Sequence, residues 1–252
     1  MQLEQFVGRK EDLLKIIRFN MERRTPMFYR TNDYIHSKRV RAIAEEFLPA
    51  AVEVYGDRLN PEKLLILAEV HDDAEIITGD IQGYDKDRMT PEQLAKIKQD
   101  ETQAIPTLAA RWPKTANGFE YAGLLINAAN KDCLEAQLVS WADKTDAYCE
   151  SMHEVQAGNK RFIGTTRDYA TVKFAKLLKE FPELREAQGK HPLFTIPSEV
   201  NLDAIMRNGR YHTAESVRIQ TGIPHYDIWR KITIEKLGIE HLTQIKEHEH
   251  AA

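Results

Sequence analysis

The sequence predicts an all-α fold, a bundle of helices followed by a small helical extension at its C-terminal end. Three observations favour this class. Apolar residues recur at helical spacing in one segment after another, and the helix-start signals Asn60-Pro61 and Thr90-Pro91-Glu92-Gln93 precede two of these segments. No stretch alternates apolar and polar residues over a useful length, which a half-buried strand would require. We therefore expect helices to form the whole core.

The first two helices are expected over residues 3–21 and 33–54. In the first, leucines and isoleucines recur at helical spacing between solvated charges. In the second, Val40 belongs to a buried apolar stripe, and His36 lies one turn earlier on the same stripe. The imidazole of His36 is therefore expected to point inward.

The next two helices are bounded by clear start signals. A helix over 61–70 begins with Asn60 as its N-cap and Pro61 at its first position, which puts the polar residues from position 71 onward at its far end. A helix over 90–111 begins with the Thr90 capping box. The glycines between these two helices predict a polar loop.

The second half of the chain continues the helical pattern. Apolar spacing predicts helices over 119–129, 133–156 and 167–181. A proline-rich linker follows, and after it short helical segments are expected to start at Ser198, Thr213 and Pro224. We interpret residues 1–185 as the core and 198–252 as the helical extension.

Composition narrows the class of protein. The chain has 252 residues, of which 42% are hydrophobic and 29% charged, with no apolar run long enough to span a membrane and no signal-peptide pattern. This predicts a soluble cytoplasmic protein, in which Cys133 and Cys149 are free thiols. The net charge of -4 argues against broad nucleic-acid binding but permits a local basic pocket for a phosphorylated small molecule.

Four polar residues that lie inward or at helix ends form a candidate metal site: His36, the pair His71-Asp72, and Asp143. Asp143 has small and apolar neighbours, so burying it is costly unless a positive charge meets it. Two imidazoles and two carboxylates make a mixed nitrogen and oxygen site, which suits a divalent transition metal such as Mn, Co, Fe or Zn. The pattern is typical of a metal hydrolase.

The same residues resemble the HD-domain metal-dependent phosphohydrolase superfamily, whose pattern is a His, a His-Asp pair and a distant Asp on separate helices. Within it, three segments resemble the HD-domain 5'-deoxynucleotidases: HDDAEIITGD at 71–80, KQDETQA at 98–104 and LVSWADK at 138–144. The resemblance covers roughly residues 10 to 180 in family order. It implies an HD-domain helical bundle that removes phosphate from deoxynucleoside monophosphates, and it suggests a homodimer.

The resemblance also implies roles for individual residues. One divalent ion (Co, Mn, Mg, Fe or Zn) is expected on the four ligands, because no His lies between Asp72 and Asp143, where two-metal members of the superfamily carry additional histidines. Glu75 would orient the attacking water or protonate the leaving 5'-oxygen, and Asp80 would lie beside the substrate. The phosphate would be bound by basic residues, for which the sequence offers Arg24, Arg30 and Lys144.

The sequence departs from the family in three places, one of which is the loop from Gln82 to Thr90, which lacks the family's proline-rich, lysine-bearing sequence. The nearest match to the family's Arg-Trp-Pro segment, which helps to exclude a ribose 2'-hydroxyl, is Arg24-Thr25-Pro26, and Ile35 replaces the acidic residue before the first His. Two alternatives to a 5'-nucleotidase therefore stay open. One is a deoxynucleoside triphosphate triphosphohydrolase of the same fold, and the other is a regulatory or binding protein that uses the HD fold and the C-terminal module.

Two further expectations concern surfaces. Residues 213–230 have the order helix, glycine turn, helix, so they resemble a helix-turn-helix unit, which we expect to pack on the core more readily than to bind DNA. Trp112, Phe119 and Tyr121 are candidates for an exposed dimer interface.

Overall fold

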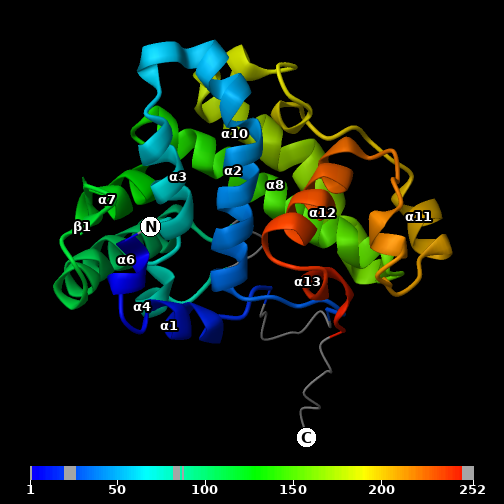
Figure 1. The fold of residues 1–252 in the computed structure, drawn as a ribbon, viewed down its shortest axis with the longest axis horizontal. Helices are drawn as coiled ribbons and strands as arrows, with labels where there is room; N and C mark the ends of the chain where they lie inside the picture. The colour runs from blue at the N-terminus through cyan, green and yellow to red at the C-terminus, as the bar shows by residue number, and fades with distance from the viewer. Residues whose placement is uncertain (1, 20–26, 82–85, 87, 246–252) are drawn as a thin grey trace, which may run out of the picture.

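Three helices, α2 (Asp33–Tyr55), α3 (Pro61–Val70) and α8 (Leu134–Gln156), pack against one another at the centre of the protein (Figure 1). They belong to a computed structural model that describes residues 2–19, 27–81, 86 and 88–245. The further α-helices of this part of the chain are α1 (Arg9–Lys15), α4 (Glu75–Thr78), α6 (Pro91–Arg111), α7 (Tyr121–Asn130), α9 (Ile163–Asp168), α10 (Phe174–Glu180), α11 (Leu202–Asn208), α12 (Pro224–Lys236) and α13 (Glu240–Thr243). The all-α class is confirmed.

Short turns of other helix types connect these elements. A π-helical turn at Tyr169–Lys173 joins α9 to α10, and 3₁₀ turns lie at Gln2–Gln5, Gly56–Arg58, Lys160–Phe162, Pro182–Ala187, Pro192–Phe194 and Ser216–Arg218. None of the helices in the described ranges combines the length and the apolarity that crossing a bilayer would require.

The predicted helix starts are confirmed where a side chain caps the helix. The carboxamide of Asn60 accepts a hydrogen bond from the backbone N–H of Lys63 at the start of α3. Thr90 and Gln93 exchange both hydrogen bonds of a capping box at the start of α6. Asn32 caps α2 in the same way as Asn60 caps α3. Local hydrogen bonds therefore fix where α2, α3 and α6 begin.

The helix expected over 119–129 starts later than predicted. Residues Thr115–Ala116 (β1) and Phe119–Glu120 (β2) form a two-stranded antiparallel hairpin, and α7 follows directly from it. Asn117 and Gly118, at the turn, have φ angles of 49° and 85°. Positive φ at two successive residues is typical of the tight hairpin turn for which Asn-Gly is the favoured sequence.

The proposed dimer interface is wrong for two of its three residues. Trp112 and Tyr121 are 7% and 0% exposed, and their rings contact the ring of Phe6 in the core. Phe119 is only partly exposed. A turn that pairs two short strands folds these aromatic residues back onto the protein, which the helical pattern of the sequence did not indicate.

The C-terminal segment packs against the central helices. α12 contacts α2 and α8, and α11 contacts α8, so this segment lies on one side of α2 while α3, α6 and α7 lie on the other (Figure 1). Tyr226, Trp229 and Ile232 of α12 are buried in the same continuous apolar core as the side chains of α2 and α8. The core therefore extends across the boundary between the two parts of the chain.

The expected helix-turn-helix unit is incomplete. Its second helix is α12, which begins at Pro224 as predicted, but only the 3₁₀ turn Ser216–Arg218 stands in place of the first helix. Ile219, an apolar residue of this segment, is 60% exposed. The segment expected to start at Ser198 becomes helical only at Leu202, after the N-cap Asn201. Helix α1 is likewise shorter than the predicted 3–21.

Candidate active site

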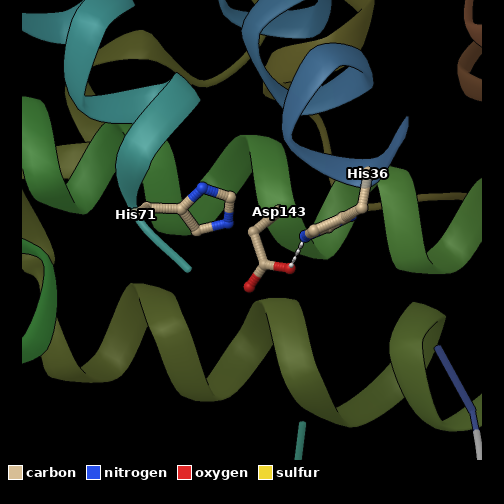
Figure 2. A group of neighbouring side chains, drawn as sticks. All are labelled: His36, His71 and Asp143. Carbon is tan, nitrogen blue, oxygen red and sulfur yellow. Dashed lines mark ion pairs between the residues drawn. The ribbon is translucent and has the colours of Figure 1, made fainter. Parts of the chain in front are cut away.

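The four predicted metal ligands meet at one point. His36 lies in the first turns of α2, His71 and Asp72 follow the end of α3, and Asp143 lies in α8; Figure 2 shows the side chains of His36, His71 and Asp143 turned toward a common space. One donor atom from each of these three residues lies within 4.8 Å of the other two. The Oδ2 atom of Asp72 lies 3.2 Å from the Nε2 atoms of both histidines.

Hydrogen bonds on the far side of each ring orient the two imidazoles. Nδ1 of His36 lies 2.7 Å from Oδ2 of Asp146, and Nδ1 of His71 lies 2.9 Å from the backbone carbonyl oxygen of Ala68. The Nε2 atoms of both rings are buried and make no hydrogen bond to a described residue. This arrangement fits a metal ion, because a ligating His holds its second ring nitrogen on a carboxylate or a carbonyl.

The electrostatics of the group agree with this fit. Burial lowers the pKa of His36, yet the surrounding carboxylates hold that pKa well above its usual value. Burial also opposes the ionisation of Asp143, but Lys144, whose Nζ lies 2.6 Å from Asp143 Oδ2, and the neighbouring histidines hold the pKa of this carboxyl well below its usual range. The excess of carboxylate charge around two imidazoles would be balanced by a divalent cation.

A second acidic group lies beside the first. Donor oxygens of Asp33, Glu75 and Asp80 all lie within 4.8 Å of one another. Burial, with Asp72 nearby, raises the pKa of Asp33 to about 7 and that of Glu75 well above its usual value. The guanidinium of Arg18 lies 3.8 Å from Asp33 and 4.0 Å from Asp72, so a cation of the chain itself stands between the two groups. Because the pKa values of Asp33 and Glu75 are raised, we interpret the second acidic group as one whose carboxyl groups retain protons.

Both groups border a cavity of about 240 Å³. Its acidic lining side chains are Asp72, Glu75, Asp80, Glu101 and Asp143, and its cationic ones are Arg18, Lys86, Lys131, Lys144 and Lys173. The apolar part of the wall includes the aromatic rings of Phe19 and Tyr169. A cavity with a metal-type donor set, several cations and aromatic surface can accommodate a phosphorylated molecule that also carries a ring.

The predicted site residues divide into three sets. The four ligands are brought together, and Glu75, Asp80 and Lys144 line the adjoining cavity. Arg24 lies outside the described residues. Arg30 is described, but it is not among the side chains that line the cavity, so the structure does not place it where we expected it.

Several residues of the site were missed by the sequence analysis, and Arg18 and Asp146 are the two that bear most directly on its chemistry. Arg18 lines the cavity together with Phe19, so an arginine followed by an aromatic residue does precede the first His, earlier in the chain than the segment that we matched. Asp146 holds the ring of His36. Its position three residues after Asp143, nearly one turn further along the same helix, was an available signal.

An all-α fold that brings together a His, a His-Asp pair and a distant Asp from three separate parts of the helical bundle defines the class of the HD-type metal-dependent phosphohydrolases. Comparison with protein-family profiles then gives the particular family. Residues 5–184 match the family described as 5'-deoxynucleotidase YfbR-like, and the chain belongs to this family.

Individual relatives agree with this assignment. The chain is 32% identical to the 4'-phosphooxetanocin A phosphatase of Priestia megaterium over 159 residues, which are 61% of this chain and 75% of the relative. It is 30% identical to a 5'-deoxynucleotidase of Vibrio cholerae over 153 residues, 58% of this chain and 77% of the relative. The solved structure of a predicted metal-dependent phosphohydrolase from Magnetospirillum magnetotacticum shares the fold, with a TM-score of 0.52 and 21% identity over 81% of this chain and 91% of that one.

Proposed function

We propose that this protein is a cytoplasmic 5'-nucleotidase that uses a divalent metal ion to remove the phosphate from deoxynucleoside monophosphates. The observation that carries the proposal is the convergence of His36, His71, Asp72 and Asp143 at the edge of a cavity with several cationic side chains. The relatives support it, because both are named as enzymes that remove phosphate from nucleotide-like molecules.

The four converging residues would hold the metal ion, with two imidazole nitrogens and two carboxylates as ligands. Such a donor set suits Mn, Co, Fe or Zn and also admits Mg. When bound, the ion would lower the pKa of a coordinated water and neutralise a phosphate oxygen, which are the two needs of phosphomonoester hydrolysis.

The cations of the cavity would bind the phosphate. Arg18 offers a planar set of N–H donors that matches the oxygens of a phosphate group, and its ion pairs with Asp33 and Glu150 fix its position. Lys144 supplies a second positive charge, held beside the site by Asp143. Phe19 and Tyr169 provide aromatic surface for the nucleoside part of the substrate.

Glu75 is suited to transfer a proton. It lies one turn after Asp72 and borders the cavity, and burial together with Asp72 and Asp80 raises its pKa well above the usual value. A carboxyl group that is kept protonated can donate its proton to the leaving 5'-oxygen. Asp80 would lie beside the substrate and hold Glu75 in place through the shared acidic group.

The test is phosphate release from a panel of ribo- and deoxyribonucleoside mono-, di- and triphosphates, with Mn²⁺, Co²⁺ or Mg²⁺ added. The proposal expects metal-dependent release of orthophosphate, fastest with deoxynucleoside monophosphates. Tripolyphosphate released from triphosphates would favour the triphosphohydrolase, and binding of nucleotides without any turnover would favour a regulatory protein.

A homodimer is also part of this proposal, formed through a surface other than Trp112 and Tyr121, which are buried. Light scattering of the full chain at micromolar concentration is the measurement. A mass near the 29.1 kDa of one chain would reject the dimer.

A further inference from the structure

The C-terminal extension reaches the metal-type site through one side chain. Trp229 of α12 donates a hydrogen bond from its indole Nε1 to Oδ1 of Asp146, over 2.6 Å. The other oxygen of the same carboxylate, Oδ2, lies 2.7 Å from Nδ1 of His36. A single carboxylate therefore joins a helix of the extension to a predicted metal ligand.

Burial keeps water away from the hydrogen bond between Trp229 and Asp146. His36 and Asp146 are fully buried, and Trp229 is 1% exposed. A buried carboxylate needs polar partners from the protein on each oxygen, and Arg39, whose Nε lies 2.8 Å from Oδ1, adds a positive charge beside the indole N–H at this atom. The guanidinium of Arg39 also lies over the ring of Trp229, 5.0 Å from its centroid, so the indole is fixed on its face as well as at its N–H.

The two histidines differ in how they are held. The ring of His71 is oriented by the backbone carbonyl of Ala68 in the preceding helix α3, which is a local contact. The ring of His36 is oriented by the side chain of Asp146, whose other oxygen is held by Trp229 together with Arg39. The extension can therefore act on one of the two imidazoles and leave the other unaffected.

We propose that Trp229 is a positioning residue of the metal centre: by holding Asp146 it fixes the ring of His36 with Nε2 directed into the site. Trp229 lies beyond residues 5–184, the range matched by the family profile, so the extension completes a site whose ligands all belong to that range. This inference rests on the proposed metal-dependent function. It gives the extension a role at the reaction centre in addition to its packing.

The experiment compares Trp229→Phe with Tyr226→Phe in the full chain. Both variants keep a buried aromatic ring in α12 and lose one buried hydrogen bond. The hydroxyl of Tyr226 lies 2.8 Å from Nδ1 of His153, and Tyr226→Phe keeps both the ring that stacks on Trp229 and the hydrogen bond from Trp229 to Asp146, so its variant is a control for any general loosening of the helix. The metal-stripped proteins are titrated with Co²⁺ by calorimetry, and the visible absorption of the bound Co²⁺ reports the arrangement of its ligands.

Trp229→Phe is expected to weaken Co²⁺ binding about 10- to 100-fold, the usual effect of losing such an outer contact, and to change the Co²⁺ spectrum. Tyr226→Phe should bind Co²⁺ with an affinity within about twofold of wild type, well below the loss expected when an outer contact of a metal ligand is removed. Unchanged affinity and spectrum in Trp229→Phe, or equal losses in both variants, would overturn the inference.

A second variant covers the case in which Trp229→Phe does not fold. Asp146→Asn keeps the size of the side chain but turns an NH₂ group toward N–H groups that a carboxylate oxygen otherwise accepts, so it should weaken Co²⁺ binding to a similar extent. Wild-type affinity in Asp146→Asn would also overturn the inference. Metal binding is measured without substrate, so a wild-type chain that binds Co²⁺ but releases no phosphate contradicts the proposed function and leaves this test intact.

Discussion

The substitution Arg9→Ala should destabilise the protein strongly, because it removes one partner of a buried ion pair. The Nε atom of Arg9, in α1, lies 2.9 and 2.7 Å from the two carboxylate oxygens of Asp73, and its Nη2 lies 2.6 Å from Oδ1. Arg9 is 4% exposed and Asp73 is fully buried. The hydroxyl of Tyr121 donates a further hydrogen bond to Asp73, over 2.8 Å.

The size of the loss in stability follows from the contacts that Asp73 retains in Arg9→Ala. Without Arg9, the carboxylate of Asp73 keeps the Tyr121 hydroxyl as its hydrogen-bond donor and loses its counter-ion. Breaking a buried pair in this way costs about 3–5 kcal/mol. At about 2–4 °C per kcal/mol for a chain of this size, the melting temperature should fall by roughly 6–20 °C. Since Asp73 follows Asp72 directly, the metal affinity should fall as well.

The assay is urea and thermal unfolding followed by circular dichroism, with Arg58→Ala as the control. Arg58 pairs with Glu186 at the surface, where its side chain is 54% exposed and solvent screens the pair, so its loss should have little effect on stability. In an Asp73→Asn background Arg9→Ala should cost less, because no buried charge is left unpaired. A loss below about 1 kcal/mol in Arg9→Ala, or equal losses in Arg9→Ala and Arg58→Ala, would refute the reasoning.

Three further predictions concern metal binding, proton transfer by Glu75 and the stability of the folded protein at low pH. Asp72→Ala should lose the bound metal, and elemental analysis that finds wild-type metal content would contradict the ligand set. Glu75→Gln should keep the metal and the fold but lose phosphatase activity by about 100-fold or more; near-normal turnover would move the proton transfer to another residue. Burial lowers the pKa values of His212 and His225 from 6.5 to about 4, so between these pH values the folded state binds fewer protons than the unfolded state. Their contribution to stability is complete above pH 6.5 and declines as the pH falls toward 4, by up to about 1.4 kcal/mol per pH unit for each histidine. Urea unfolding at pH 7 and pH 5 should therefore show that His225→Gln loses less unfolding free energy on acidification than wild type does. An identical loss in the two proteins would contradict this role of His225.

Much of the fold could be predicted because its signals are local. Helices α2, α3, α6 and α8 begin within a residue or so of the predicted positions, since a capping side chain or a change in apolar spacing marks each start. The hairpin at 115–120 was missed because two-residue strands are too short to show alternation. The helix expected from Thr213 is replaced by a 3₁₀ turn, and nothing in the apolar spacing of that segment distinguished the two.

The sequence by itself predicted the candidate ligands, because residue type and helical position limit which side chains can turn inward, and its resemblance to the HD-domain superfamily implied the reaction class. His36 lies on the apolar stripe of its helix, and the structure buries it completely. The tertiary structure alone decided which partners these residues meet. Arg18 enters the cavity while Arg30 does not line it, and Trp229 reaches Asp146 across 83 positions of sequence. The reason is physical: helical periodicity specifies which face of a helix is buried, whereas the packing of distant helices specifies what lies against that face.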